Sequence, residues 1–321
     1  MRFEEYRRCD AVALAGLVRK GEVTPGELLD VAIARAEAVN PRINAIVHKQ
    51  YEQARATIGK GLPDGPLAGV PYLIKDLAIF QGGEPARLGS ISTPISWPIT
   101  TVVIRRAANA PAWSLWVAVR HRNLASARAP KPRLFGPCRN PWNLAYSAGG
   151  SSGGAAAAVA AGILPVAHAT DGGGSIRIPA AQCGLLGLKP SRGRMSFAPD
   201  VGESWGGMST AHVVCRSVRD CAVMLDITAG AEPGDPYTAP PPERPFVEEI
   251  NRPPGRLKIA MMRKDHLGAA LHPECVAAVE RAGKLCESLG HVVEEAYPDL
   301  DFGELMPSIR VDHEYQYRAQ S

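Results

Sequence analysis

The sequence predicts an α/β fold, and three observations support this class. Segments with the patterns of strands and of helices alternate along the chain. The clearest alternation, at residues 257–294, has the pattern of a strand, a helix and a second strand. Of the 321 residues, 45% are hydrophobic and 21% are charged. That composition is typical of a globular protein and excludes a disordered chain, because enough apolar surface exists to offset the loss of chain entropy.

Charge and composition exclude two further classes of protein. The 36 Lys and Arg residues against 32 Asp and Glu give a net charge of +4, which is too small for a dedicated nucleic-acid-binding protein. Glycine (32) and proline (28) are abundant, but they follow no Gly-x-y period, so a collagen is excluded. The excess is therefore expected in loops.

The sequence also predicts a soluble, cytoplasmic protein. The longest apolar stretch, residues 155–169, contains Gly162 and Pro165 and is too short and too weakly hydrophobic to span a bilayer. The N-terminal residues MRFEEY are charged and lack the apolar segment of a signal peptide. The seven cysteines form no C-x-x-C pair, so free thiols are expected. No His or Cys cluster has metal-ligand spacing, and no metal site is predicted.

Two helices are predicted at the N-terminus. Asp10 can cap the first, which ends at Gly21. The second begins with a capping box formed by Thr24 and Glu27, and the Asn-Pro pair at residues 40–41 predicts its end.

The next segment contains an unusual lysine. Residues 45–47 are a candidate strand, and residues 51–60 are a candidate helix. The sequence of residues 66–76 predicts a turn, followed by an apolar extended run that ends at Lys75. Lysine is rare at the end of a buried strand. The ammonium either lies in solvent at the strand end or has a chemical role.

Two glycine-rich loops dominate the middle of the chain. Residues 149–154 (GGSSGG) precede an alanine-rich run that stops at Gly162, which predicts a loop leading into a helix. Residues 164–168 have the pattern of a buried strand. The second loop, residues 171–177 (DGGGSIR), follows that strand, and residues 184–188 are a further short strand candidate.

The C-terminal part ends with a βαβ pattern. Ser217 is a plausible N-cap for an apolar helix that ends at Gly230. Residues 231–256 are rich in proline and charge, so a surface connection is predicted there. The remaining strand, helix and strand are expected at residues 257–262, 272–289 and 291–294.

The second glycine loop has the composition of an oxyanion site. Backbone N–H groups at the start of a helix attract a negative oxygen. Gly172, Gly173 and Gly174 allow a ligand to approach the backbone closely, because no Cβ interferes. Ser175 follows directly, where a nucleophile would lie beside an oxyanion hole.

Several other site types do not fit the two loops. A flexible linker is not favoured, because both loops lie among apolar segments. A P-loop is excluded by the missing G-x-x-x-x-G-K-[ST], and the first loop lacks the acidic residue of a dinucleotide site. A nucleophile elbow is excluded because Arg177 stands where the second glycine of G-x-S-x-G belongs. His168 and Asp171 are too close in sequence to form a Ser-His-Asp triad with Ser175.

A serine nucleophile without that triad needs another base. A buried lysine can serve when its amine is neutral, and Lys75 is the candidate. Asp76 follows it, but successive strand residues point to opposite faces. Asp76 therefore need not hold Lys75 in its charged form.

These motifs together resemble the amidase signature family. The resemblance covers roughly residues 5–80 and 134–310. Four stretches carry it: GVPYLIKD at 69–76, GGSSGG at 149–154, DGGGSIRIP at 171–179, and CGLLGLKPS with RGR at 183–194. It implies a single domain over residues 1–321, with a mixed central β-sheet covered by helices.

The resemblance implies a Ser-Ser-Lys triad. Ser175 would attack the amide carbonyl and form an acyl-enzyme. Ser151, expected after a cis peptide from Gly150, would relay the proton, and Lys75 would be the final base. Backbone N–H groups of the loop would form the oxyanion hole at Gly172, Gly173 and Gly174. Ser152, Asp171 and Arg177 match supporting positions that shape the loops.

The implied function is hydrolysis of a carboxylic acid amide to the acid and ammonia or an amine, without a cofactor or metal. The expected partner is a small-molecule amide, with no nucleic acid or membrane, and a homodimer is compatible with the sequence. One alternative is the glutaminase-like A subunit of a tRNA-dependent amidotransferase, which shares the motifs. The other is a catalytically inactive, truncated amidase-like product.

Two regions depart from the family pattern. Residues 81–131 lack the expected strand motif, and no Asp or Glu occurs between residues 85 and 170. This segment is either divergent or the product of two compensating frameshifts. Residues 311–321 turn polar where family members continue. A truncated C-terminus, with an exposed apolar sheet edge, is therefore expected.

Overall fold

The computed structural model describes residues 1–62, 64–75, 113–119, 135–198, 202–265 and 269–301. Within these residues, no helix is both long and apolar enough to cross a bilayer. Apart from residues 113–119, the atypical segment 81–131 lies outside the described residues, as do residues 311–321. The chain divides into two compact units, Met1–Ile250 and Asn251–Ser321. The single-domain expectation stays a prediction.

The N-terminal part of the first unit is helical, and its caps are those that the sequence predicts. Asp10 accepts a hydrogen bond from the Ala13 N–H at 2.9 Å. Thr24 and Glu27 form the reciprocal capping box. The four helices are α1 (Phe3–Tyr6), α2 (Ala11–Arg19), α3 (Pro25–Ile43) and α4 (Tyr51–Gly59).

The end of α3 differs from the prediction. The helix continues through Pro41 to Ile43, and the strand predicted directly after it is absent. The physical reason lies in Asn40, whose Oδ1 accepts the N–H groups of Ala45 and Ile46, both at 2.8 Å. A side chain therefore satisfies the donors that a strand would have placed in a sheet.

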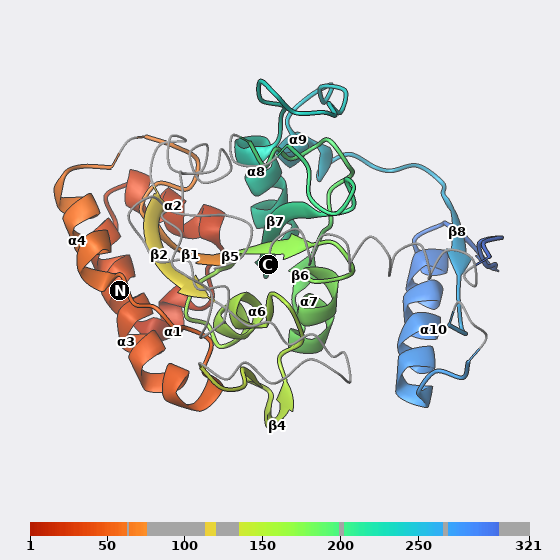
Figure 1. The fold of residues 1–321 in the computed structure, drawn as a ribbon, viewed down its shortest axis with the longest axis horizontal. Helices are drawn as coiled ribbons and strands as arrows, with labels where there is room; N and C mark the ends of the chain where they lie inside the picture. The colour runs from red at the N-terminus through yellow and green to blue at the C-terminus, as the bar shows by residue number, and fades with distance from the viewer. Residues whose placement is uncertain (63, 76–112, 120–134, 199–201, 266–268, 302–321) are drawn as a thin grey trace. The chain divides into compact units, whose positions relative to one another are not determined.

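A five-stranded sheet forms the centre of the first unit (Figure 1). Its order is β2-β1-β5-β7-β6; β1 is parallel to β2 and β5, whereas β7 is antiparallel to β5 and β6. The sheet is mixed, so the predicted fold class is confirmed. The strands are β1 (Val70–Lys75), β2 (Trp113–Val119), β5 (Val166–Asp171), β6 (Leu186–Gly187) and β7 (Thr210–Cys215).

Two apolar cores cover the two faces of this sheet. Leu73 on β1 belongs to the core under α6 and α7, whereas its neighbours Tyr72 and Ile74 belong to the core under α2 and α8. This alternation follows from the two-residue period of a strand. The remaining elements of the unit are α6 (Gly153–Ala160), α7 (Arg177–Cys183), α8 (Val218–Thr228), the short α9 (Phe246–Glu249) and the hairpin of β3 (Arg139–Asn140) with β4 (Asn143–Ser147).

A buried carboxylate joins α8 to α2. Ser217 caps α8, as predicted, by accepting the Asp220 N–H at 3.1 Å. The Asp220 side chain is fully buried and accepts the N–H groups of Ala11 at 2.9 Å and Val12 at 3.1 Å. Burial raises the pKa of Asp220 to about 6.

This raised pKa predicts a specific pH dependence of stability. The folded state binds the Asp220 proton more tightly than the unfolded chain, so the contribution is present at low pH and lost as pH rises through about 6. Raising the pH from about 5 to about 8 should therefore lower the unfolding free energy by about 1 kcal/mol. Asp220→Asn, which cannot titrate, should lack this component. Urea unfolding of both proteins at the two pH values tests this; identical pH dependence would contradict it.

The second unit confirms the predicted βαβ pattern. Its elements are β8 (Lys258–Met261), α10 (Pro273–Ser288) and β9 (Val292–Glu295), and the two strands are parallel. His272 caps α10 by accepting the Glu274 N–H at 3.3 Å.

Candidate active site

Lys75 is buried in a cluster of hydroxyl groups. It is the last residue of β1, and only 2% of its surface is exposed. Its Nζ lies 2.7 Å from Ser151 Oγ, 2.9 Å from Ser152 Oγ and 2.8 Å from Thr170 Oγ1. The alternative of a solvated lysine at the strand end is therefore wrong.

The first glycine loop brings both serines to this amine. The Gly150–Ser151 peptide bond is cis, which confirms the expectation from the family resemblance. Gly149 has a φ of +82°, and a Cβ there would lie 2.9 Å from the Pro179 Cα. Only glycine fits this position, because both its conformation and its surroundings exclude a side chain. The loop therefore packs tightly against α7.

The second loop lies beside the first. The Ser152 N–H donates to the Ser175 carbonyl oxygen at 3.3 Å, so a backbone contact links the two loops. Ser175 is half-buried, whereas Ser151 and Ser152 are buried. Side-chain hydrogen bonds thus bring Lys75, Ser151 and Ser152 together, and Ser175 is joined to them through the backbone.

Asp171 organises the second glycine loop from within. It is fully buried, and its carboxylate accepts the N–H groups of Gly174 at 2.7 Å, Ile176 at 3.2 Å and Arg177 at 3.3 Å. The Arg177 guanidinium donates to both oxygens at 2.9 Å. Burial by itself would raise the pKa of Asp171, but the Arg177 hydrogen bonds and charge, with the Gly174 N–H, outweigh it and hold the pKa below its ordinary value.

The loss of these bonds should destabilise the fold. We expect Asp171→Asn to lower the unfolding free energy by about 2–3 kcal/mol, because an amide cannot accept all the donors that the carboxylate accepts. Because the pKa of Asp171 is lowered, its contribution exists above the unfolded pKa and disappears as pH falls. Urea unfolding measures both effects. The matched control is Asp226→Asn, at an exposed carboxylate that also accepts two backbone N–H groups; equal losses in the two variants would contradict the prediction.

The site includes two residues of β5 that sequence reasoning did not assign. Thr170 contacts the Lys75 amine, and His168 Nδ1 accepts the Lys75 backbone N–H at 3.2 Å. Burial, followed by the charges of Lys75 and His212, lowers the pKa of His168 to about 3, so the imidazole is neutral near pH 7. Their only sequence signal is a polar residue at alternate positions of an apolar strand.

The glycine loop itself is closely packed. The Gly174 N–H is used by Asp171, and a Cβ at Gly174, whose φ is +119°, would lie 2.7 Å from Ile178 Cδ1. Gly172 and Gly173 lie between Asp171 and this turn. They are the two glycines of the loop whose N–H groups the Asp171 carboxylate does not bind.

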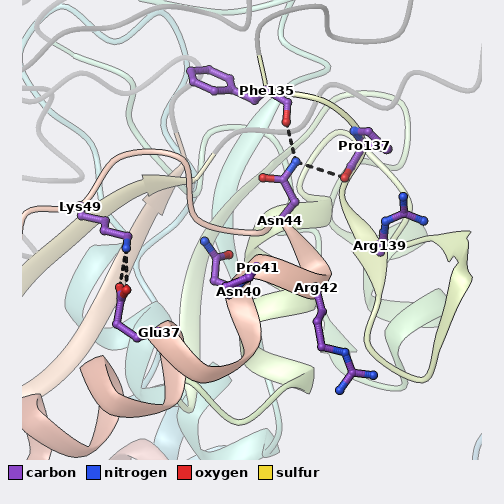
Figure 2. A pocket seen from close by; sticks show the side chains of 9 residues that line it. All are labelled: Glu37, Asn40, Pro41, Arg42, Asn44, Lys49, Phe135, Pro137 and Arg139. Atoms are coloured by element: carbon purple, nitrogen blue, oxygen red, sulfur yellow. Dashed lines mark hydrogen bonds and ion pairs between the residues drawn. The ribbon is translucent and has the colours of Figure 1, made fainter.

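A separate cavity of about 380 Å³ lies between the end of α3 and β3 (Figure 2). Lys49 pairs with Glu37 at its edge, and Asn44 Nδ2 donates to the carbonyl oxygens of Phe135 at 2.6 Å and Pro137 at 3.2 Å. None of its lining residues belongs to the Lys75 cluster. The candidate site is therefore identified by the hydrogen-bonded cluster around Lys75, and not by the size of this cavity.

The chain is similar to known proteins in both sequence and structure. The sequence model of the family described as Amidase matches residues 27–307. Two curated 6-aminohexanoate-cyclic-dimer hydrolases, from Pseudomonas sp. (strain NK87) and Paenarthrobacter ureafaciens, are each 42% identical to this chain over 296 residues, or 90% of it.

Solved structures of related proteins also match this chain. The structure of 6-aminohexanoate cyclic dimer hydrolase complexed with substrate matches with a TM-score of 0.84 and 40% identity, over 91% of this chain and 61% of that one. A bacterial aryl acylamidase of the amidase signature enzymes matches with a TM-score of 0.78 and 31% identity, over 90% of this chain and 61% of that one. The chain spans 59% of the length of the two curated relatives.

Proposed function

The chain belongs to the amidase family, and from that premise we propose that it hydrolyses a carboxylic acid amide through a serine acyl-enzyme. One observation carries the proposal. The buried amine of Lys75 lies 2.7 Å from Ser151 Oγ, and the adjacent Ser152 is tied to the Ser175 backbone. This arrangement supports a series of base, proton relay and nucleophile.

The proposed reaction begins with proton transfer from the nucleophile. Ser175 Oγ attacks the amide carbonyl carbon while its proton passes to Ser151, and the Ser151 proton passes to the neutral amine of Lys75. The C–N bond of the tetrahedral intermediate then breaks, and the leaving ammonia or amine takes the proton back along the same path. Water attacks the acyl-serine ester by the same relay and releases the carboxylic acid.

The negative oxygen of the intermediate needs hydrogen-bond donors. We assign this role to the backbone N–H groups of Gly172 and Gly173, because Gly174 already donates to Asp171. Preformed donors of this kind stabilise the transition state, since they need no reorganisation during the reaction. Asp171, Arg177 and Ser152 act by shaping the two loops.

The names of the relatives indicate which substrate classes to test. They are named for hydrolysis of the cyclic dimer of 6-aminohexanoate and of aryl acylamides, so small cyclic and linear amides of these two kinds are the first compounds to test. The absence of nucleic-acid and membrane partners, a homodimer and a cytoplasmic location stay predictions.

Covalent labelling tests the proposal. Protein whose folding is verified by circular dichroism is treated with a fluorophosphonate, and its intact mass and peptide map are recorded. We expect one adduct, on Ser175, together with release of ammonia or amine from at least one amide of the panel. Well-folded protein that neither takes the label nor releases amine would overturn the proposal in favour of a catalytically inactive product.

A further inference from the structure

The sheet topology places a second loop against the proposed oxyanion loop. β5 ends at Asp171, and β7 begins at Thr210, which is the register partner of Asp171 in the antiparallel ladder. The chain leaving β5 and the chain entering β7 therefore lie side by side at one end of the sheet. Trp205 is in the segment that enters β7.

The indole of Trp205 packs directly on Gly172. A Cβ built at Gly172 would lie 2.6 Å from Trp205 Cε3 and 2.9 Å from Cζ3, and one at Gly173 would lie 3.9 Å from Cζ3. The six-membered ring thus occupies the space of a side chain at residue 172. Gly172 does not have the left-handed φ that favours glycine, so the indole, and not the backbone conformation, explains the glycine.

The backbone of Trp205 is held in an uncommon conformation. Its φ is +54°, and the two glycines after it, residues 206–207, also have positive φ. The turn is fixed by the Ser209 N–H, which donates to the Ser204 carbonyl at 3.1 Å, and by Arg192 Nε, which donates to the Gly207 carbonyl at 3.0 Å. A bulky residue in the left-handed region is a genuine outlier, and such outliers cluster at functional sites.

We propose that Trp205 is a positioning residue, which holds Gly172 and Gly173 in the geometry that binds the oxyanion. This inference rests on the proposed function. The indole ring occupies the space on one side of the loop. The N–H groups of Gly172 and Gly173 therefore cannot rotate into that space. Trp205 itself takes no part in proton transfer.

The test is a double-mutant cycle on Ser175 labelling and on amide hydrolysis. Trp205→Ala should lower the fluorophosphonate rate constant and kcat by about tenfold to a hundredfold, with KM little changed, because misplaced donors weaken transition-state binding. Gly172→Ala should lose about a hundredfold, because its methyl group displaces the ring and the loop. The double variant should be no slower than Trp205→Ala, because the methyl group then has room.

A conservative variant and a control variant complete the test. Trp205→Phe retains an aromatic ring and should recover most of the rate. Trp142→Ala removes an exposed tryptophan of the β3–β4 hairpin and should label like the wild type. Thermal unfolding identifies any variant that has lost its fold.

Each outcome decides one claim. The positioning role alone is overturned if the wild type is active and Trp205→Ala reacts at the wild-type rate. It is also overturned if the losses of the two single variants add in the double variant. A folded wild type that neither labels nor hydrolyses any amide overturns the proposed function, and the positioning role with it.

Discussion

Ser175→Ala should lose fluorophosphonate labelling entirely and hydrolyse amides at least about ten-thousandfold more slowly than the wild type. The loss of the hydroxyl removes the only atom that the proposed mechanism uses to form the acyl-enzyme. The glycine loop and the Lys75 cluster should stay in place, because the Ser175 contact to Ser152 is made by its backbone carbonyl. Substrate binding is therefore expected to persist.

Intact mass and steady-state kinetics measure these effects. The matched control is Ser288→Ala, which removes a serine hydroxyl on α10 that donates to the Leu285 carbonyl. It should leave labelling unchanged. Labelling of Ser175→Ala at the wild-type rate would move the nucleophile to another residue.

Lys75→Met should be nearly as severe, with a loss of about a thousandfold or more in the acylation rate. Methionine has a similar length but cannot accept a proton, so the Ser151 relay would end without a base. Three hydroxyl groups, of Ser151, Ser152 and Thr170, would also lose a shared partner. Methionine has a volume close to that of lysine and leaves no large cavity, so the fold should survive.

Single-turnover labelling with a fluorophosphonate separates the chemical step from substrate binding. Lys49→Met is the control, since Lys49 is a half-exposed lysine paired with Glu37 at the edge of the separate cavity. It should react like the wild type. A Lys75→Met variant that acylates normally would show that the relay ends elsewhere.

The parts of the fold that the sequence predicts well are those with local causes. The helix caps at Asp10, Thr24 and Ser217 involve side chains and N–H groups three residues apart, so a short window contains the whole interaction. The strand predicted at residues 164–168 is found at Val166–Asp171, and β7 was not predicted. Thr210 and His212 interrupt its apolar run, and its pairing with β5 and β6 makes it a strand.

The candidate site shows the same division. Lys75, Ser151 and Ser175 lie in contiguous motifs and could be found without coordinates. The burial of Lys75, by contrast, depends on residues 76 to 95 positions away. The contact between Trp205 and Gly172 likewise comes from strand pairing, which no local pattern encodes.

β5 contacts both ends of the proposed proton path. Thr170 binds the Lys75 amine, His168 binds the Lys75 backbone, and Asp171 holds the loop that carries Ser175. The proposed base and the proposed nucleophile are therefore both held by one strand in the middle of the sheet. Thermal fluctuations of the sheet should move them in concert and leave their spacing almost unchanged. Substitutions in surrounding loops can then alter which amide is accepted while the reacting groups keep their alignment.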